Sequence, residues 1–195
     1  MIISGYDIDL KRLKHEDIEM LRGWRNAEHI RNSMEYREHI SPEMQEKWFR
    51  SIDNASNNYF IISYKGEKIG VINGSGIDWI KKETLNGGIF IWKEEYWNTL
   101  IPLLSSILLT DISFSLGMER SYARVLKSNP KAISFNKLLG YELMPDQEET
   151  QNQLYVLTKE NYFKKTAKLR KTLEKLSSGK YLIRISNMQQ EASSN

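Results

Sequence analysis

Apolar and polar residues alternate along this chain with two different periods, which change at polar or glycine-containing breaks. Residues 6–13 alternate residue by residue, as is typical of a half-buried strand. Residues 16–26 instead place Ile18, Leu21 and Trp24 on one stripe of a helix. A second helix is predicted to begin at Ser41, because serine caps a helix and the following proline suits its first turn.

The same patterns divide the chain up to residue 160 into strands and helices without an internal repeat. Gly117 and Gly140 stand where helices are expected to end, in the left-handed conformation that glycine adopts easily. The order β-α-α-β-β-β-α-β-α-β-β predicts a mixed α/β fold. Further strands are expected at residues 59–64, 69–72, 84–92, 118–126, 141–144 and 154–158, a hairpin turn at 65–68, and helices at 100–116 and 129–140.

The last part of the chain differs from the rest in charge. Residues 161–195 contain eight Lys or Arg and two Glu, a net charge of +6, so the net +3 of the whole chain leaves −3 for residues 1–160. We therefore predict a domain at 1–160 and a basic C-terminal helix with a flexible tail at 161–195. The helix is expected at 161–178, a short strand at 180–185 and disorder from 187, with the apolar helix positions Phe163, Leu169, Leu173 and Leu176.

Three interpretations of this basic helix remain open. We favour a helix that docks its leucines on the body of the protein or on a second copy in a homodimer. A contact with an acidic surface or a nucleic acid comes second, and a nucleic-acid partner is not favoured overall. A helix on a membrane surface comes third, because the apolar face has no aromatic residue except Phe163.

Composition excludes several classes of protein. The chain has 195 residues, enough for one domain with a real core, and no cysteine, which excludes disulfides and thiolate chemistry. A metal site is not expected, because His15, His29 and His39 lack the four-residue spacing of a helical zinc site. The first residues do not resemble a signal peptide, and the longest apolar stretch is too short for a membrane span. We expect a cytoplasmic protein.

Three local strings carry a family resemblance. The first is Trp24-Arg25-Asn26, followed by Ile30, Arg31 and Met34; the second is Ile40-Ser41 before Trp48-Phe49; the third runs from Asn129 to Tyr141. In this order they resemble the GCN5-related N-acetyltransferase (GNAT) superfamily over residues 6–160. The branch they resemble contains amino-sugar N-acetyltransferases of the pseudaminic-acid type and enzymes that act on ribosomal-protein N-termini.

The resemblance implies a fold, a co-substrate and a set of site residues. The fold is a central mixed, mostly antiparallel twisted sheet flanked by about four helices, with the C-terminal helix added. The co-substrate is acetyl-CoA, and the partner is a small-molecule amine. The cofactor-binding positions implied are Ile89, Phe90, Ile91, Trp92, Asn98, Thr99, Asn129 and Phe135, and the substrate-binding positions are Trp24, Arg25, Asn26, Arg31 and Met34.

Two features depart from the family pattern. The expected pyrophosphate loop, residues 93–102, contains no glycine, and Pro102 removes one backbone N–H. Asn86 and Phe135 stand where the family often has a proton-transferring Glu and Tyr, and neither side chain transfers a proton at neutral pH. Asp78, Glu83 and His39 are the conceivable bases that remain.

The sequence thus leaves three functions to compare. The leading hypothesis is an acyl-CoA-dependent N-acetyltransferase that acts on an amino sugar or sugar nucleotide. The alternatives are a GNAT-like binding protein without catalysis and a protein N-terminal acetyltransferase. Each site residue also has a structural interpretation: Trp24 as a core residue, His39 as a linker residue, and Arg25, Asn26 and Arg31 as solvated or internally paired groups.

Overall fold

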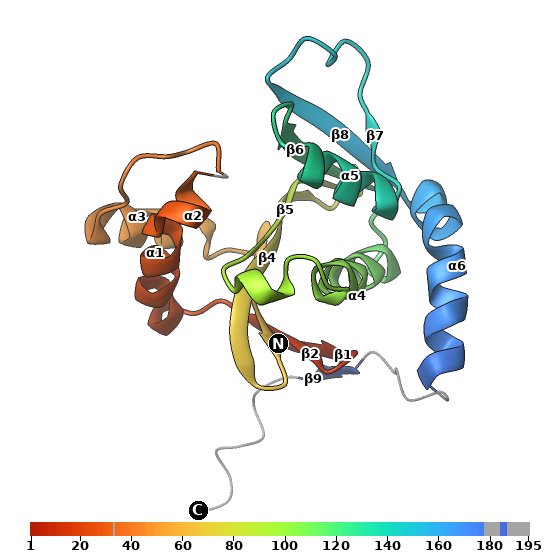
Figure 1. The fold of residues 1–195 in the computed structure, drawn as a ribbon, viewed down its shortest axis with the longest axis horizontal. Coiled ribbons are helices and arrows are strands. Elements are labelled where there is room, and N and C mark those ends of the chain that lie inside the picture. The colour runs from red at the N-terminus through yellow and green to blue at the C-terminus, as the bar shows by residue number, and fades with distance from the viewer. Residues whose placement is uncertain (33, 178–183, 187–195) are drawn as a thin grey trace, which may run out of the picture.

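The computed structural model describes residues 1–32, 34–177 and 184–186, and its strands form one twisted sheet (Figure 1). The strand order is β7-β8-β6-β5-β4-β3-β2-β1-β9, and only β5 and β6 pair in parallel. The strands are β1 Ile2–Gly5, β2 Ile8–Arg12, β3 Asn57–Tyr64, β4 Glu67–Asp78, β5 Glu83–Ile91, β6 Arg120–Leu126, β7 Glu142–Leu143, β8 Asn152–Thr158 and β9 Arg184–Ser186.

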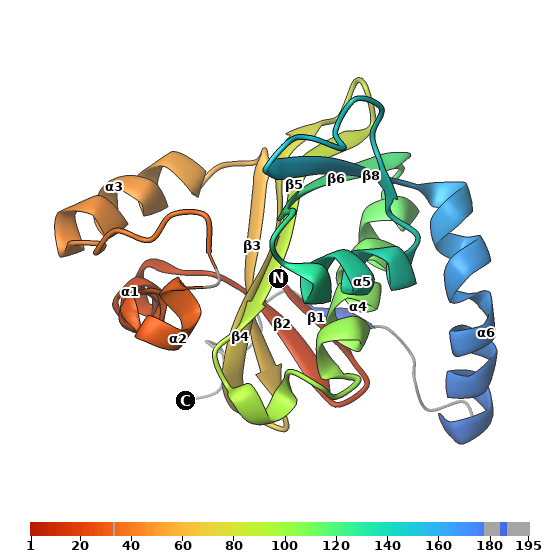
Figure 2. The ribbon, with the colours of Figure 1, turned by 45° about the horizontal axis from the view of Figure 1, so that its top comes forward.

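Helices cover both faces of this sheet (Figures 1 and 2). Neighbouring residues of β3 show the two faces, since Ile62 packs with helix α4 and Ile61 packs with α1 and α3. Helices α5 and α6 lie with α4 beside β6 and β8. The helices are α1 Ile18–Asn26, α2 Glu28–Arg31, α3 Pro42–Ile52, α4 Ile101–Ser115, α5 Pro130–Leu139 and α6 Lys159–Ser177, with short 3-10 helices at His15–Asp17 and Glu94–Tyr96.

Helix α4 holds the two halves of the sheet together. Its Leu108 and Ile112 belong to the core formed by β1–β5, whereas its Ile107 and Phe114 belong to the core formed by β6, β8, α5 and α6. Such an apolar helix, in contact with both cores, matches the strongly hydrophobic run in the sequence. No helix within the described ranges has the length and apolar character that crossing a membrane requires.

The predicted helix caps are present. The Ser41 Oγ accepts a hydrogen bond from the Met44 N–H at 3.2 Å, and the Asn129 side chain accepts one from the Ala132 N–H at 3.0 Å. Gly140 ends α5 with φ of +102°, in the left-handed region. These local signals fixed the boundaries of α3 and α5 correctly.

Several predicted boundaries were wrong. Residues 6–13 are not one strand, because Tyr6 and Asp7 form a turn with φ of 58° and 59° that separates β1 from β2. Strand β4 continues to Asp78 through a polar, glycine-containing stretch, because β3 and β5 pair with it on both sides. Helix α2 was not predicted, and α6 begins at Lys159. The Leu176 side chain, residues 180–183 and the tail from 187 lie outside the described part of the chain.

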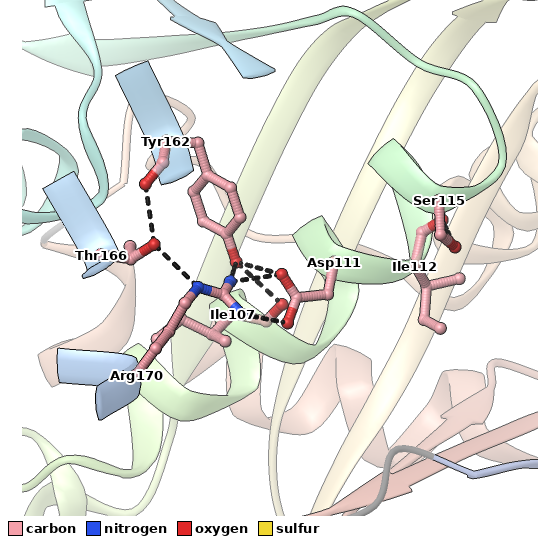
Figure 3. A network of polar contacts seen from close by, with 7 residues as sticks. All are labelled: Ile107, Asp111, Ile112, Ser115, Tyr162, Thr166 and Arg170. Carbon is pink, nitrogen blue, oxygen red and sulfur yellow. Dashed lines mark hydrogen bonds and ion pairs between the residues drawn. The ribbon is translucent and has the colours of Figure 1, made fainter. Parts of the chain in front are cut away.

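Helix α6 is attached to α4 by a buried polar network (Figure 3). Tyr162 is fully buried and its hydroxyl lies 2.8 Å from an Asp111 carboxylate oxygen. The Arg170 guanidinium binds both oxygens of Asp111, and its Nε donates to the Thr166 Oγ1 at 3.0 Å. Burial is the main cause that raises the pKa of Tyr162, and nearby Asp111 raises it further, so the hydroxyl stays protonated.

The network predicts that α6 contributes to the stability of the body. Arg170→Met leaves the Asp111 carboxylate mostly buried without its cation, so we expect the free energy of unfolding to fall by roughly 3 kcal/mol. Arg50→Met is the matched control, because Arg50 is exposed and pairs only with its helix neighbour Glu46; we expect a loss below about 1 kcal/mol. Urea denaturation measures both, and equal losses would contradict a stabilising role for the network.

Candidate active site

The sheet divides where β5 and β6 separate. The two strands pair only at Glu83 with Arg120 and at Thr84 with Ser121. Beyond these pairs β5 continues along β4 to Ile91, while β6 continues along β8 to Leu126. The inner edges of both strands are therefore unpaired beyond this point, which we call the apex.

The free edge of β5 carries backbone groups without partners in the sheet. The Trp92 N–H bonds to the Ile69 carbonyl at 2.9 Å, so the alternate residues of β5 direct their backbone groups toward β4. By the same alternation, Gly87, Ile89 and Ile91 direct their backbone N–H and carbonyl groups toward the gap between β5 and β6. An extended ligand with amide groups can satisfy them as an added strand does.

A cavity of about 1210 Å³ follows this gap. On one face of the sheet the lining comes from α4 along its whole length, from α5 and from β6; on the other face it comes from α2 and the residues after it. Most of the lining is apolar, with a few polar groups, as is typical of small-molecule sites. The cavity thus extends to both faces of the sheet at the free β5 edge, and we call the part on each face a compartment.

The loop before α4 does not fill this cavity. Trp97 and Leu100 both line it, and each remains partly exposed, at 39% and 54%. The Trp97 indole N–H donates to the Ile91 carbonyl at 2.7 Å, so one acceptor of the free edge is already taken. Glu94 and Glu95 do not line the cavity.

Some backbone donors at the start of α4 remain available. The N–H groups of Trp97 and Thr99 bond within the loop, and the Ile101 N–H bonds to the Thr99 Oγ1. Among the described residues, the N–H groups of Asn98, Leu100 and Leu103 have no such partner. All three residues line the cavity, at the positive end of the helix dipole.

Two hydroxyl groups meet at the apex. The Tyr141 Oη lies 3.1 Å from the Ser121 Oγ, and both residues line the cavity. A Cβ on Gly87 would come within 3.3 Å of the Tyr141 Oη and 3.4 Å of the Ser121 Oγ, so glycine leaves room for this pair. Burial raises the pKa of Tyr141, and the hydrogen bond with Ser121 opposes part of that shift.

Most of the predicted cofactor positions line the cavity. Trp92 is the exception: its ring is buried against Trp24 on the other face of the sheet, and its N–H donates to the Lys68 carbonyl. Asn129 lines the cavity while it caps α5. The predicted positions found in the lining are Ile89, Phe90, Ile91, Asn98, Thr99, Asn129 and Phe135.

Of the predicted substrate positions, only Met34 lines the cavity. Trp24 stacks on Trp92 at 5.7 Å with an interplanar angle of 7° and belongs to the core between α1, α3 and the sheet. Asn26 uses both ends of its amide on the backbone of Ile40, at 2.8 and 2.9 Å. Trp24 is therefore a core residue and Asn26 is paired within the protein, which are the structural interpretations given above.

Arg25 and Arg31 lie outside the cavity lining, and neither forms an ion pair with the residues that the structure describes. Arg25 lies over the Phe90 ring at 5.6 Å, and its Nη1 is buried without a hydrogen bond. Burial lowers its pKa. Among the described residues, Arg31 has no ion pair.

The three predicted bases do not line the cavity. Asp78 accepts hydrogen bonds from the N–H groups of Ile80 and Lys81 and so stabilises the β4–β5 turn. Glu83 pairs with Arg120 at 3.1 Å. His39 is exposed and lies outside the lining.

Other titratable groups do line the cavity, and sequence reasoning missed them. His29 lies near the loop, 3.9 Å from Glu94, and Glu35 is the carboxylate of the lining. Tyr141 stands in the third family-like string, but its hydroxyl gained significance only from its position at the apex. His29 lies in α2 and Glu35 follows it. Because the sequence pattern did not predict α2, it gave no reason to place these two residues beside the cavity.

Comparison with known proteins agrees with this architecture. A family model described as an acetyltransferase (GNAT) domain matches residues 10–179. This match covers most of the chain, so the protein belongs to the GNAT acetyltransferase family. The predicted superfamily and fold are thereby confirmed, and membership supports the prediction of an N-acetyltransferase. A search of curated proteins gave no match.

Solved structures show the same fold at low sequence identity. Spermidine N-acetyltransferase from Vibrio cholerae, in complex with CoA and spermine, is 19% identical, with a TM-score of 0.67 over 80% of this chain and 98% of that one. The ribosomal L7/L12 α-N-protein acetyltransferase RimL, in complex with CoA, is 16% identical, with a TM-score of 0.68 over 81% and 98%. A domain from Methanocaldococcus jannaschii is 20% identical, with a TM-score of 0.67 over 77% and 97%.

Proposed function

We propose that this protein transfers an acetyl group from acetyl-CoA to the amine of a small substrate, an amino sugar or sugar nucleotide. The observation that carries the proposal is the free edge of β5 beside a two-compartment cavity, in a chain of the GNAT family. Two of the similar solved structures are complexes with CoA, which is consistent with this choice of co-substrate.

The residues around the gap suit acetyl-CoA, which supplies a thioester when bound. The backbone groups of Gly87 and Ile89 would hold its amide-containing arm, and the N–H groups of Asn98, Leu100 and Leu103 would face its phosphates. The loop offers three free N–H groups and no glycine-rich turn. We therefore expect its phosphate contacts to contribute less to the affinity for acetyl-CoA than a continuous series of backbone N–H groups would.

Tyr141 is the proton donor that the site offers. Its raised pKa means that the hydroxyl holds its proton at Oη throughout the neutral range. Ser121 orients the hydroxyl at the apex, where the two compartments meet. Tyr141 can therefore supply a proton to a leaving group in the gap, although Phe135 cannot.

The compartment that contains Glu35, which we call the acceptor compartment, suits a polar molecule that carries a single amine. Glu35 provides a counter-charge for an ammonium group and a place for its proton. The Asn73 amide also lines this compartment; its Nδ2 bonds to the Asn86 carbonyl at 3.0 Å, which leaves its oxygen as an acceptor. A polyamine carries several cations and would require more than this one lining carboxylate, so we favour an amino sugar.

The direct test is acetyl-CoA-dependent turnover on a panel of amino sugars, sugar nucleotides, spermidine and peptides. We expect free CoA release with at least one amino sugar or sugar nucleotide and slower release with spermidine. Turnover restricted to peptides would support a protein N-terminal acetyltransferase, whose fold this chain also shares. Acetyl-CoA binding without turnover on any amine would support the binding-protein alternative.

Tyr141→Phe tests the proton donor. We expect kcat to fall about 100-fold with little change in the KM for acetyl-CoA, because the hydroxyl acts in proton transfer. Tyr155→Phe is the control: that buried hydroxyl bonds to Gln153 and lies outside the cavity, so kcat should be kept. Because burial places the pKa of Tyr141 above the ordinary 10.0, wild-type kcat should show no loss from its ionisation below pH 10.0. Equal kcat in both variants would exclude this role.

Glu35→Gln tests the acceptor compartment. We expect the KM for the amine to rise about tenfold at neutral pH while the KM for acetyl-CoA stays the same, because only the amine loses its counter-charge. Glu38→Gln removes the same charge from a nearby exposed residue outside the lining and serves as the control. Identical kinetics in both variants would contradict the assignment of Glu35.

A further inference from the structure

The outward face of α6 carries a row of lysines. Lys164, Lys168, Lys171 and Lys175 follow one another at spacings of four, three and four residues, which places them on one side of the helix. Lys165 lies next to this row. All five residues are exposed. The row is about 16 Å long, since each helical residue adds about 1.5 Å.

The opposite face of the same helix is already occupied by the body. Tyr162, Thr166 and Leu173 are buried there, and the network with Asp111 fixes the rotation of α6 about its axis (Figure 3). The row of lysines is therefore held outward, along the edge of the molecule where α6 lies (Figures 1 and 2).

No ion pair among the described residues neutralises this row. Ion pairs join Lys159 to Glu119 and Arg170 to Asp111, but none reaches the lysines of the row within the described residues. Helix α6 contains seven basic and two acidic residues, which leaves 21 basic and 23 acidic residues in the rest of the chain. The positive charge of the protein is thus concentrated on this one helix.

Such a row has a cost in the free protein. Like charges three or four residues apart on a helix repel each other and destabilise it. A surface that served solubility alone would mix charges of both signs. A partner that supplies negative charges would remove the repulsion.

We propose that the lysine row of α6 binds the phosphate backbone of a nucleic acid. Lysine acts as a point charge and needs no defined geometry, which suits a repeating line of phosphates. At about 3.4 Å per phosphate, the row spans roughly five phosphates of one strand. A membrane surface is disfavoured, because the outward face is lysine and the apolar face is docked on the body. The row lies outside the cavity, so this binding does not depend on acetyl transfer.

Fluorescence anisotropy with labelled 20-nucleotide RNA and DNA, each single- and double-stranded, tests this proposal between 20 and 200 mM KCl. For four lysine contacts we expect a slope of log K against log salt of about −3 on single strands and about −4 on duplexes. The substitutions Lys164→Gln, Lys168→Gln, Lys171→Gln and Lys175→Gln together should bring the slope close to zero and weaken binding more than tenfold at 50 mM salt. A difference between RNA and DNA would identify the source of the phosphates.

A second quadruple variant controls for net charge. It neutralises four exposed lysines that form no row, Lys11, Lys47, Lys82 and Lys137, and should keep the wild-type slope. Circular dichroism should show the same helix content for both variants, because every position is exposed. The proposal is overturned if wild type does not bind at 20 mM salt or if both variants lose affinity equally. Tighter binding to phosphatidylserine vesicles or to polyglutamate than to either nucleic acid overturns it as well.

Discussion

The early separation of β5 from β6 is the constraint on which this structure depends. Unpaired backbone N–H and carbonyl groups inside a protein are unfavourable, so a sheet normally closes such a gap. Here the edge formed by Gly87, Ile89 and Ile91 stays unpaired, and Trp97 satisfies only one of its carbonyls. A site that binds an extended, amide-containing ligand needs this exposed edge, which explains why the gap is kept beside the cavity.

Other parts of the protein maintain the gap. With only two residue pairs between β5 and β6, the halves of the sheet rely on α4, whose Leu108 and Ile107 pack into different cores. Helix α4 is in turn held by α6 through Asp111 and Arg170 (Figure 3). Helix α6, most of which lies beyond the predicted domain boundary at residue 160, therefore supports α4.

Sequence patterns predicted the elements better than the site. Caps such as Ser41 and Asn129 are local, so the sequence showed where α3 and α5 begin. The β5 residues Ile89 to Ile91 line the cavity as expected, because their contribution depends on strand position alone. The meeting of Tyr141 with Ser121 depends on three-dimensional packing between residues 20 apart, and no local pattern carries that information. The same reason explains why residue type alone did not show that Asp78, Glu83 and His39 lie outside the cavity lining.

Hydrogen–deuterium exchange at single residues, with and without acetyl-CoA, tests the central claim most directly. The account predicts that the amides of Ile89 and Ile91 exchange more slowly when acetyl-CoA is added, because they direct their N–H groups into the gap. The amides of Phe90 and Trp92 already bond to β4 and should change little. Unchanged exchange at Ile89 and Ile91 under saturating acetyl-CoA would contradict the account, even if the ligand binds elsewhere on the protein.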